Sequence, residues 1–204
     1  MSVSKSIALC RRLCAVSPAS SHGSNKLPAK CYAAAVKKIA REEPDTGFMI
    51  LGAQKDRQEG EIIAEAAGER AVNLCGELSF LASAAALSHA SVYIGNDTGL
   101  MHIAAAQHVP VLEASCYPSD LHFTYASSPV RFAPYHVPSV TVLPDQALDG
   151  CAGASYEGCE RRDEVHCIAQ IRPETLLAGY RLLKKQSRLS CPHLYMNSRG
   201  ILDR

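Results

Sequence analysis

Residues 91–106, with the sequence SVYIGNDTGLMHIAAA, form the stretch that decides the fold of this chain. The apolar residues 92–94 predict a short buried strand, and the small residues from Gly99 onward predict a helix. A polar turn at 95–98 joins them. A strand that leads directly into a helix gathers free backbone N–H groups at the positive end of the helix dipole, which predicts an anion site. The alternative is an ordinary strand–helix corner with Asp97 as N-cap.

On both sides of this stretch, short apolar segments alternate with segments of helical periodicity. Further strands are predicted at 13–17, 48–51, 71–74, 109–114 and 139–143, and helices from about 28, with Pro28 in the first turn, to 43, beyond 56 as far as 67, 79–90 and 173–185. Ser79 suits the N-cap of one helix and Gly68 the C-cap of another. Regular alternation of this kind is typical of a parallel sheet with crossover helices, so we expect an α/β fold.

The pattern sets the limits of one domain. Residues 1–12 form a ragged, basic lead-in, and residues 13–185 form the predicted domain. Within it, residues 116–138 and 145–167 show no clear period. Residues 186–204 have no packing pattern, so we expect a poorly ordered tail.

Composition and charge exclude several classes of function. The chain has 204 residues, 47% of them hydrophobic and 20% charged, which fits a globular protein with a sizeable core. The net charge of +1, the low aromatic content of 6% and the lack of tryptophan give no support for binding nucleic acid or a membrane surface. No segment approaches the length of a membrane span, and the N-terminus does not resemble a secretion signal. We expect a cytoplasmic chain with reduced thiols.

Three polar loops should meet at one edge of the sheet, because the carboxyl ends of parallel strands lie together. The loops are residues 20–26, 52–56 and 95–102. Their candidate ligand-binding side chains are Ser20, Ser21, Lys26, Gln54, Asp97, Thr98 and His102. A lysine near a helix N-terminus favours a phosphate-bearing ligand. Each residue also has a purely structural explanation: the serines as turn formers, Lys26 and Gln54 as solvated side chains, Asp97 as a cap and His102 as a partner of a backbone carbonyl.

Other ligand and catalytic classes lack their motifs. The loop after the first strand has one glycine, which disfavours a dinucleotide, and no phosphate loop of the Walker type is present. Neither a nucleophile elbow nor a close pair of carboxylates indicates a hydrolase. The sequence predicts a binding edge without a general base opposite it.

The cysteines give only a weak indication of a metal site. Cys151, Cys159 and Cys167 are spaced as C-x7-C-x7-C with His166 beside the last, a set able to bind zinc or iron. The spacing is not that of a C-x-x-C knuckle, so loop cysteines that meet the core by chance are the preferred explanation, and we expect no metal. The remaining cysteines of the predicted domain lie mainly in or beside apolar segments and read as small core residues.

Four segments together resemble a known family. Residues 95–106, GNDTGLMHIAAA, followed by VPV at 109–111, are similar to the central motif of heptosyltransferase-type glycosyltransferases, glycosyltransferase family nine. Residues 73–79, NLCGELS, resemble the family's lead into the preceding helix. Residues 17–21, SPASS, with KLP at 26–28, resemble its lysine loop, and residues 168–183 resemble its closing helix. The resemblance covers roughly residues 13–185.

This resemblance implies a fold and a function. The family has the GT-B fold of two Rossmann-like domains, and every matched segment belongs to the C-terminal half, which binds the nucleotide-sugar donor. The fold implied is therefore a Rossmann-like open parallel sheet with helices on both faces. The implied ligand is a nucleotide-sugar, plausibly ADP-heptose, used as a substrate without a further cofactor to build a cell-surface glycan such as lipopolysaccharide.

The same resemblance implies a role for each candidate residue. Lys26 would contact the donor diphosphate with Ser20 or Ser21 beside it, and Thr98 and Gly99 would bind phosphate at the helix N-terminus. Asp97 would hold the sugar or phosphate region, Gln54 would lie near the nucleoside, and His102 occupies the motif's histidine position.

Two departures from the family bear on activity. The tryptophan of the lysine loop is missing, since Leu27 directly precedes Pro28. The family's proposed base is an aspartate of the N-terminal, acceptor-binding domain, which this sequence does not contain. We therefore expect donor binding with poor sugar transfer unless a separate acceptor-binding domain or polypeptide takes part. A non-catalytic nucleotide-sugar module and a metal-stabilised interaction protein are the alternatives.

Overall fold

The computed structural model describes residues 7, 9–21, 23–122, 128–151, 163–186 and 193–202. The strands are β1 (Arg12–Ser17), β2 (Thr46–Ile50), β3 (Ala71–Asn73), β4 (Val92–Asn96), β5 (Val111–Ala114), β6 (Ser139–Val142), β7 (His193–Asn197) and β8 (Gly200–Leu202). The α-helices are α2 (Ala29–Glu42), α3 (Arg57–Ala67), α4 (Phe80–Leu87), α5 (Gly99–Ala106), α6 (Pro129–Phe132) and α7 (Pro173–Gln186). Short 3-10 turns are η1 (Gly23–Asn25), η2 (Gln54–Asp56), η3 (Gly68–Arg70) and η4 (Cys167–Gln170).

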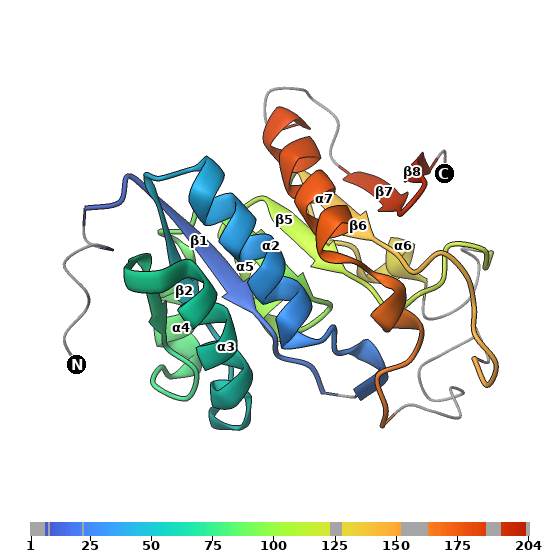
Figure 1. Cartoon of the computed structure of the whole chain (residues 1–204), viewed down its shortest axis with the longest axis horizontal. Helices are drawn as coiled ribbons and strands as arrows, with labels where there is room; N and C mark the ends of the chain where they lie inside the picture. The colour runs from blue at the N-terminus through green and yellow to red at the C-terminus, as the bar shows by residue number, and fades with distance from the viewer. Residues whose placement is uncertain are drawn as a thin grey trace.

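The strands form one twisted sheet with the order β3-β2-β1-β4-β5-β6-β7-β8 (Figure 1). Strands β1 to β7 are parallel, and β8 pairs antiparallel with β7. The order of the first six strands is that of a doubly wound fold, and the direction of winding reverses between β1 and β4. The α/β class and the Rossmann-like parallel sheet predicted from the sequence are confirmed.

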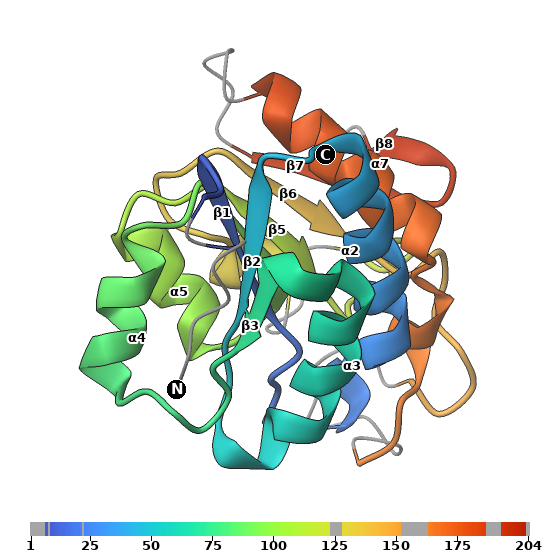
Figure 2. The ribbon, with the colours of Figure 1, turned by 60° about the vertical axis from the view of Figure 1, so that its left-hand side comes forward.

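Helices cover both faces of the sheet, as predicted (Figure 2). Helices α2, α3 and α7 lie on one face, where they bury strand residues such as Val16 and Phe48. Helices α4 and α5 lie on the other face, over strand residues such as Met49 and Tyr93. Neighbouring residues of each central strand point to opposite faces, so these strands are buried on both sides and read as continuous apolar runs.

Local signals set several helix ends. The Ser79 hydroxyl accepts a hydrogen bond of 3.2 Å from the Ala82 N–H, so Ser79 caps α4 as predicted. Gly68 follows α3 with a φ of 68°, a conformation that favours glycine. The interpretation of Asp97 as N-cap is wrong, because α5 begins at Gly99 and its N-cap is Thr98.

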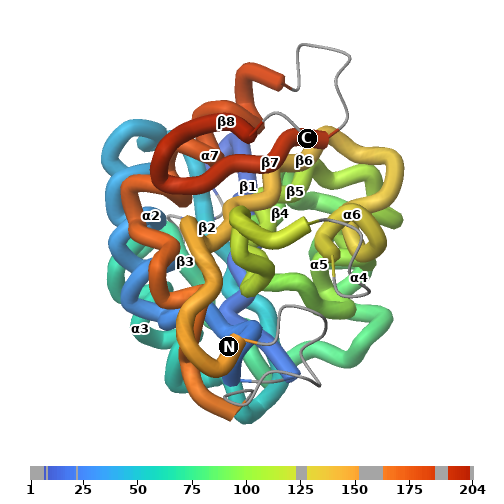
Figure 3. The backbone as a smooth tube through the Cα atoms, turned by 90° about the vertical axis from the view of Figure 1, so that its right-hand side faces the viewer, coloured from blue at the N-terminus to red at the C-terminus, as the bar shows by residue number. Residues whose placement is uncertain are grey.

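The prediction of a poorly ordered tail is wrong for residues 193–202. Strand β7 pairs with β6 from Ser139↔His193 to Val142↔Met196, and β8 folds back on β7 to form the edge of the sheet (Figure 3). These strands are short and mixed in polarity, so they carry no periodicity of their own. Their position is set by the edge of β6 that faces away from β5, because an open strand edge offers a full row of backbone hydrogen-bond partners. Residues 187–192 and 203–204 of the tail lie outside the described residues.

The segments without a clear period also contain some structure. Residues 116–138 include the single turn α6, and the buried Tyr117 hydroxyl donates a 2.6 Å hydrogen bond to the His122 carbonyl. No helix in the described ranges is long and apolar enough to cross a membrane.

A polar chain runs across β5, β6 and β7 on the face that carries α4 and α5. The Thr141 hydroxyl donates to Glu113 Oε2 at 2.9 Å, and His193 Nε2 lies 3.3 Å from the same hydroxyl. The Ser139 hydroxyl contacts His193 Nδ1. Burial raises the pKa of the Glu113 carboxyl, with the Asp97 charge adding to the effect, and burial lowers the pKa of His193 to about 4.

Acid should therefore weaken the docking of β7. The pKa of His193 is lower in the folded protein than in the unfolded chain, so the unfolded chain binds more protons and folding loses stability as the pH falls from about 6.5 to 4. We expect the free energy of unfolding of the parent protein to fall more steeply over this range than that of His193→Gln. Urea unfolding at several pH values measures both, and parallel pH profiles would contradict the assignment.

Candidate functional site

The candidate site lies at the carboxyl edge of the sheet, where the ends of β1 and β4 flank the reversal in strand order. In open α/β sheets this position forms a ligand crevice. The candidate residues all come from loops or helix starts at this edge, as the sequence predicts. The contacts between the loops show how the edge is assembled.

The side chain of Asn96, the last residue of β4, holds the loop that follows β1. Asn96 is fully buried. Its Nδ2 donates hydrogen bonds to the carbonyls of Pro18 at 3.1 Å and Ala19 at 3.0 Å. Its Oδ1 accepts from the Leu27 N–H at 3.1 Å and from the Tyr32 hydroxyl at 2.8 Å. One amide thus satisfies both ends of the first loop and uses all four of its own hydrogen-bonding positions.

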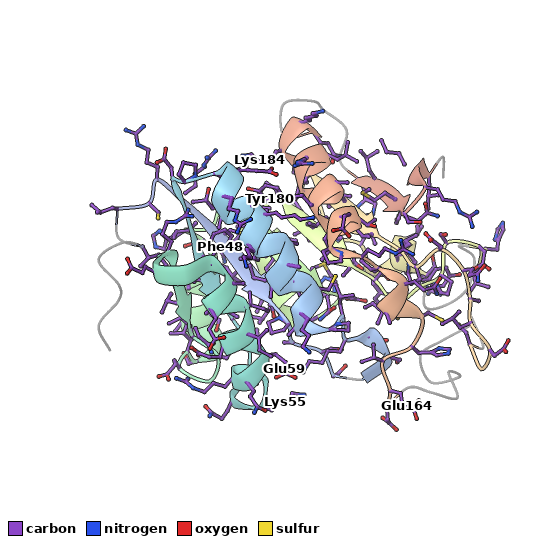
Figure 4. The ribbon with its side chains drawn as sticks, viewed as in Figure 1. Phe48, Lys55, Glu59, Glu164, Tyr180 and Lys184 are labelled. Atoms are coloured by element: carbon purple, nitrogen blue, oxygen red, sulfur yellow. The ribbon has the colours of Figure 1, made fainter. Side chains whose placement is uncertain are left out.

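The second loop is joined to the first by charged groups. Lys26 Nζ contacts Asp56 Oδ1 at 3.2 Å and Glu59 Oε1 at 2.8 Å. Lys55 Nζ donates to the Ser20 carbonyl at 3.2 Å. Figure 4 shows Lys55 and Glu59 near each other at the beginning of α3. We call the group of Lys26, Asp56 and Glu59 the lysine corner.

The lysine corner is electrostatically coupled. Burial alone would lower the pKa of Lys26, but hydrogen bonds and charge interactions with Glu59 and Asp56 raise it. The hydrogen bond from Lys26 holds the pKa of Glu59 below its ordinary value. Lys26 and Glu59 therefore form a charged pair near neutral pH, and Asp56 places a second carboxyl group beside the ammonium.

A second group of residues surrounds the N-terminus of α5. Thr98 has extended backbone angles and makes no side-chain bond to the helix. Its Oγ1 and the hydroxyl of the buried Tyr93 are enclosed side by side: burial raises the pKa of Tyr93 to about 12, and the neighbouring hydroxyls of Thr98 and Ser17 limit that rise. Gly99 is exposed, with open space where a side chain would project. Asp97 Oδ1 lies 3.6 Å from His102 Nε2 across the start of the helix. We call residues 97–102 the α5 corner.

Gln54 belongs to a third contact at the same edge. It is exposed on η2 and folds over Gly76, whose N–H donates to the Gly52 carbonyl at 3.0 Å. Gly76 has a φ of 78°, and a Cβ there would collide with Gln54. The loop between β3 and α4 therefore requires glycine at this position.

The structure divides the predicted site into two parts. Lys26 lies with α3 on one side, while Asp97, Thr98, Gly99 and His102 lie together at α5. Within the described ranges, no hydrogen bond or ion pair joins Lys26 to the α5 corner. Ser20 is buried and Ser21 is exposed in the first loop.

Nothing in the sequence pattern singles out Asn96, Asp56 or Glu59 as residues of this edge. Asn96 reads as part of a polar turn, and the two acids read as ordinary residues at the start of a helix. Asn96 could have been found from its position at the end of a buried strand, because a buried side-chain amide must form several hydrogen bonds.

The candidate metal ligands are only partly placed. Cys167 Sγ lies 3.4 Å from His166 Nδ1, and the Leu148 N–H donates to the same sulfur at 3.5 Å. Cys151 is a free thiol, and Cys159 lies outside the described residues. The described part of the chain contains no cluster of three potential metal ligands. The expectation of no metal stays a prediction.

Solved structures share this arrangement of strands and helices. The chain matches the glycosyl transferase family 9 structure from Veillonella parvula DSM 2008 with a TM-score of 0.66 and 18% identity, over 86% of this chain and 46% of that one. It matches E. coli ADP-heptose lps heptosyltransferase II with a TM-score of 0.64 and 21% identity, over 87% and 48% of the two chains. The fold is thus that of an α/β glycosyltransferase domain.

The family follows from the sequence match. A model of glycosyltransferase family 9 (heptosyltransferase) matches residues 4–142, which is more than half of the chain. This protein belongs to that family. E. coli heptosyltransferase WaaC with ADP has the same fold at a TM-score of 0.57 and 13% identity, over 87% of this chain and 45% of that one. The chain spans about half the length of these structures, and a comparison with curated sequences finds no match.

Removal of the Asn96 side chain should release the first loop and destabilise the fold. Asn96→Ala leaves four polar groups, three of them in buried hydrogen bonds, without this partner, so we expect a loss of about 3 kcal/mol or more in the free energy of unfolding. Tyr32→Phe removes one of the four bonds and should cost about 1 kcal/mol. Urea unfolding measures both, and equal losses in the two variants would show that Asn96 does not hold the loop.

Proposed function

We propose that this chain is the donor-binding half of a family 9 glycosyltransferase and that the α5 corner receives the diphosphate of a nucleotide-sugar. The observation that carries the proposal is the uncapped N-terminus of α5. The chain caps α4 with Ser79, yet the Thr98 side chain makes no bond to α5, and its hydroxyl is enclosed beside that of Tyr93. The free N–H groups at the start of α5 and the helix dipole favour negative charge, and the Thr98 hydroxyl beside them can turn to donate to an anion.

The chemistry proposed for this half is stabilisation of the leaving group. When the sugar–phosphate bond breaks, negative charge develops on the departing nucleoside diphosphate. The N–H groups at the start of α5, the Thr98 hydroxyl and the Lys26 ammonium supply fixed positive potential for that charge. Ser20 and Ser21 would lie beside the diphosphate, and Gln54 near the nucleoside. Asp97 and His102 flank the start of α5 and would orient the sugar or phosphate region.

The acceptor side of the reaction needs groups from elsewhere. Transfer requires a positioned acceptor hydroxyl and a base to take its proton. We assign that base to a separate acceptor-binding domain or polypeptide. The proposed whole reaction is transfer of a nucleotide-activated sugar, with ADP-heptose as the leading candidate, to a cell-surface glycan such as lipopolysaccharide. The E. coli neighbours named for ADP-heptose and ADP support this choice. The proposed location is the cytoplasm, and the donor is a substrate rather than a cofactor.

Replacement of Thr98 by valine separates binding from stability. Thr98→Val keeps the shape of the side chain but removes the hydroxyl that lies beside that of Tyr93, so we expect a loss of about 1 kcal/mol or less in stability but about tenfold weaker ADP binding. Thr46→Val is the matched control, because the Thr46 hydroxyl bonds Glu43 at 3.2 Å on the opposite edge of the sheet. That variant should lose stability and keep its affinity for ADP. Titration calorimetry and urea unfolding measure the two quantities, and equal ADP affinities for Thr98→Val and the parent would contradict the proposed diphosphate position.

Sugar transfer tests the division of labour between the two halves. The chain alone should bind ADP or an ADP-sugar but transfer sugar to an acceptor glycan poorly, and addition of an acceptor-binding polypeptide should restore turnover. Robust transfer by the chain alone would show that it carries its own base. Donor binding without transfer in the presence of acceptor-binding partners would instead favour a non-catalytic nucleotide-sugar module.

A further inference from the structure

The ammonium group of Lys26 is already paired in the protein without ligand. Its side chain is 24% exposed and lies between the carboxylates of Asp56 and Glu59. One positive charge therefore faces two negative charges. An arriving diphosphate gains little from this lysine unless one carboxylate leaves, because two carboxylates already surround its ammonium group.

The two carboxylates differ in their freedom to move. The Asp56 side chain is fully buried, and its second oxygen accepts a 3.0 Å hydrogen bond from the Ala53 N–H. Gly52 packs against it, since a Cβ at Gly52 would lie 3.0 Å from that of Asp56. Asp56 is therefore fixed on three sides.

Glu59 is held much less firmly. Its side chain is 31% exposed, and Lys26 is its only side-chain hydrogen-bond partner in the described part of the chain. A part-exposed ion pair of this kind contributes little to stability, and a long side chain gains rotamer freedom when it leaves. Glu59 is the carboxylate that can be displaced.

The position of Glu59 is also one that suits an anion. It lies in the first turn of α3, an eleven-residue helix, where its carboxylate bonds its own backbone N–H. Lys55 is near enough to help lower the pKa of Glu59, and Figure 4 shows the two residues at the same end of α3. A helix start and two lysines therefore surround the carboxylate.

We propose that Glu59 is a displaceable counter-ion of Lys26, which occupies the lysine until a phosphate group of the donor takes its place. Asp56 stays bound and keeps the ammonium in position throughout. Glu59 thereby sets the affinity for the donor, because each binding event includes the loss of the ion pair between Lys26 and Glu59. This proposal rests on the proposed function, since it names a residue that competes with the donor at the same edge.

Titration calorimetry with ADP tests the competition. Glu59→Gln removes the charge but keeps the length of the side chain, and we expect it to bind ADP about three- to tenfold more tightly than the parent. Glu59→Asp keeps the charge but shortens the side chain, and it should also bind more tightly. Glu65→Gln is the matched control, because Glu65 is exposed on the same helix and its loss changes the net charge equally. Its affinity should stay within about twofold of the parent.

A variant of Lys26 tests whether the gain in ADP affinity depends on the ion pair between Lys26 and Glu59. In a Lys26→Gln background, Glu59→Gln should give no gain, because the ion pair that opposes binding is already gone. Unchanged or weaker ADP binding by Glu59→Gln and Glu59→Asp, or an equal gain in Glu65→Gln, overturns the proposal while the proposed function stands. Failure of the parent and all variants to bind ADP overturns the proposed function and this proposal together.

Discussion

The arrangement of the site depends on the buried amide of Asn96. A parallel sheet brings the ends of β1 and β4 together where the winding reverses, but it does not by itself fix the loops that leave those ends. Asn96 does so, because its amide pairs with the backbone at both ends of the first loop and with Tyr32 of α2. A buried amide is tolerated only when its donors and acceptors are satisfied, so loop and strand constrain each other.

This constraint creates two corners of different electrostatic character. At the N-terminus of α5 the free backbone N–H groups create a positive potential. The N-cap residue Thr98 makes no side-chain hydrogen bond to them. At the lysine corner the positive charge is matched by carboxylates, one fixed and one part-exposed. We propose that the two corners bind different parts of one diphosphate. In the proposed donor complex the open corner would receive charge directly, whereas the lysine corner would yield its ammonium only in exchange for Glu59.

Much of the fold could be predicted because it depends on local chemistry. Alternating apolar strands and amphipathic helices identify the parallel sheet, and Ser79 and Gly68 mark helix ends through side-chain capping and backbone conformation. Strands β7 and β8 could not be predicted from the sequence, because they form by pairing with the open edge of β6 and have no hydrophobic periodicity of their own. The helix N-terminus after β4 was predictable as an anion corner for the same local reason.

The sequence by itself determined the α/β class, the position of the α5 corner and the resemblance to family 9. Each of these can be recognised from short local segments of the chain. Only the tertiary structure decided how the loops meet. Asn96 reaches Pro18 across 78 positions of the chain, and Lys26 reaches Asp56 across 30. Contacts between such distant positions depend on strand order and register, which no local periodicity encodes. The sequence therefore identified Lys26 as a candidate ligand, and the fold decided that carboxylates already accompany it.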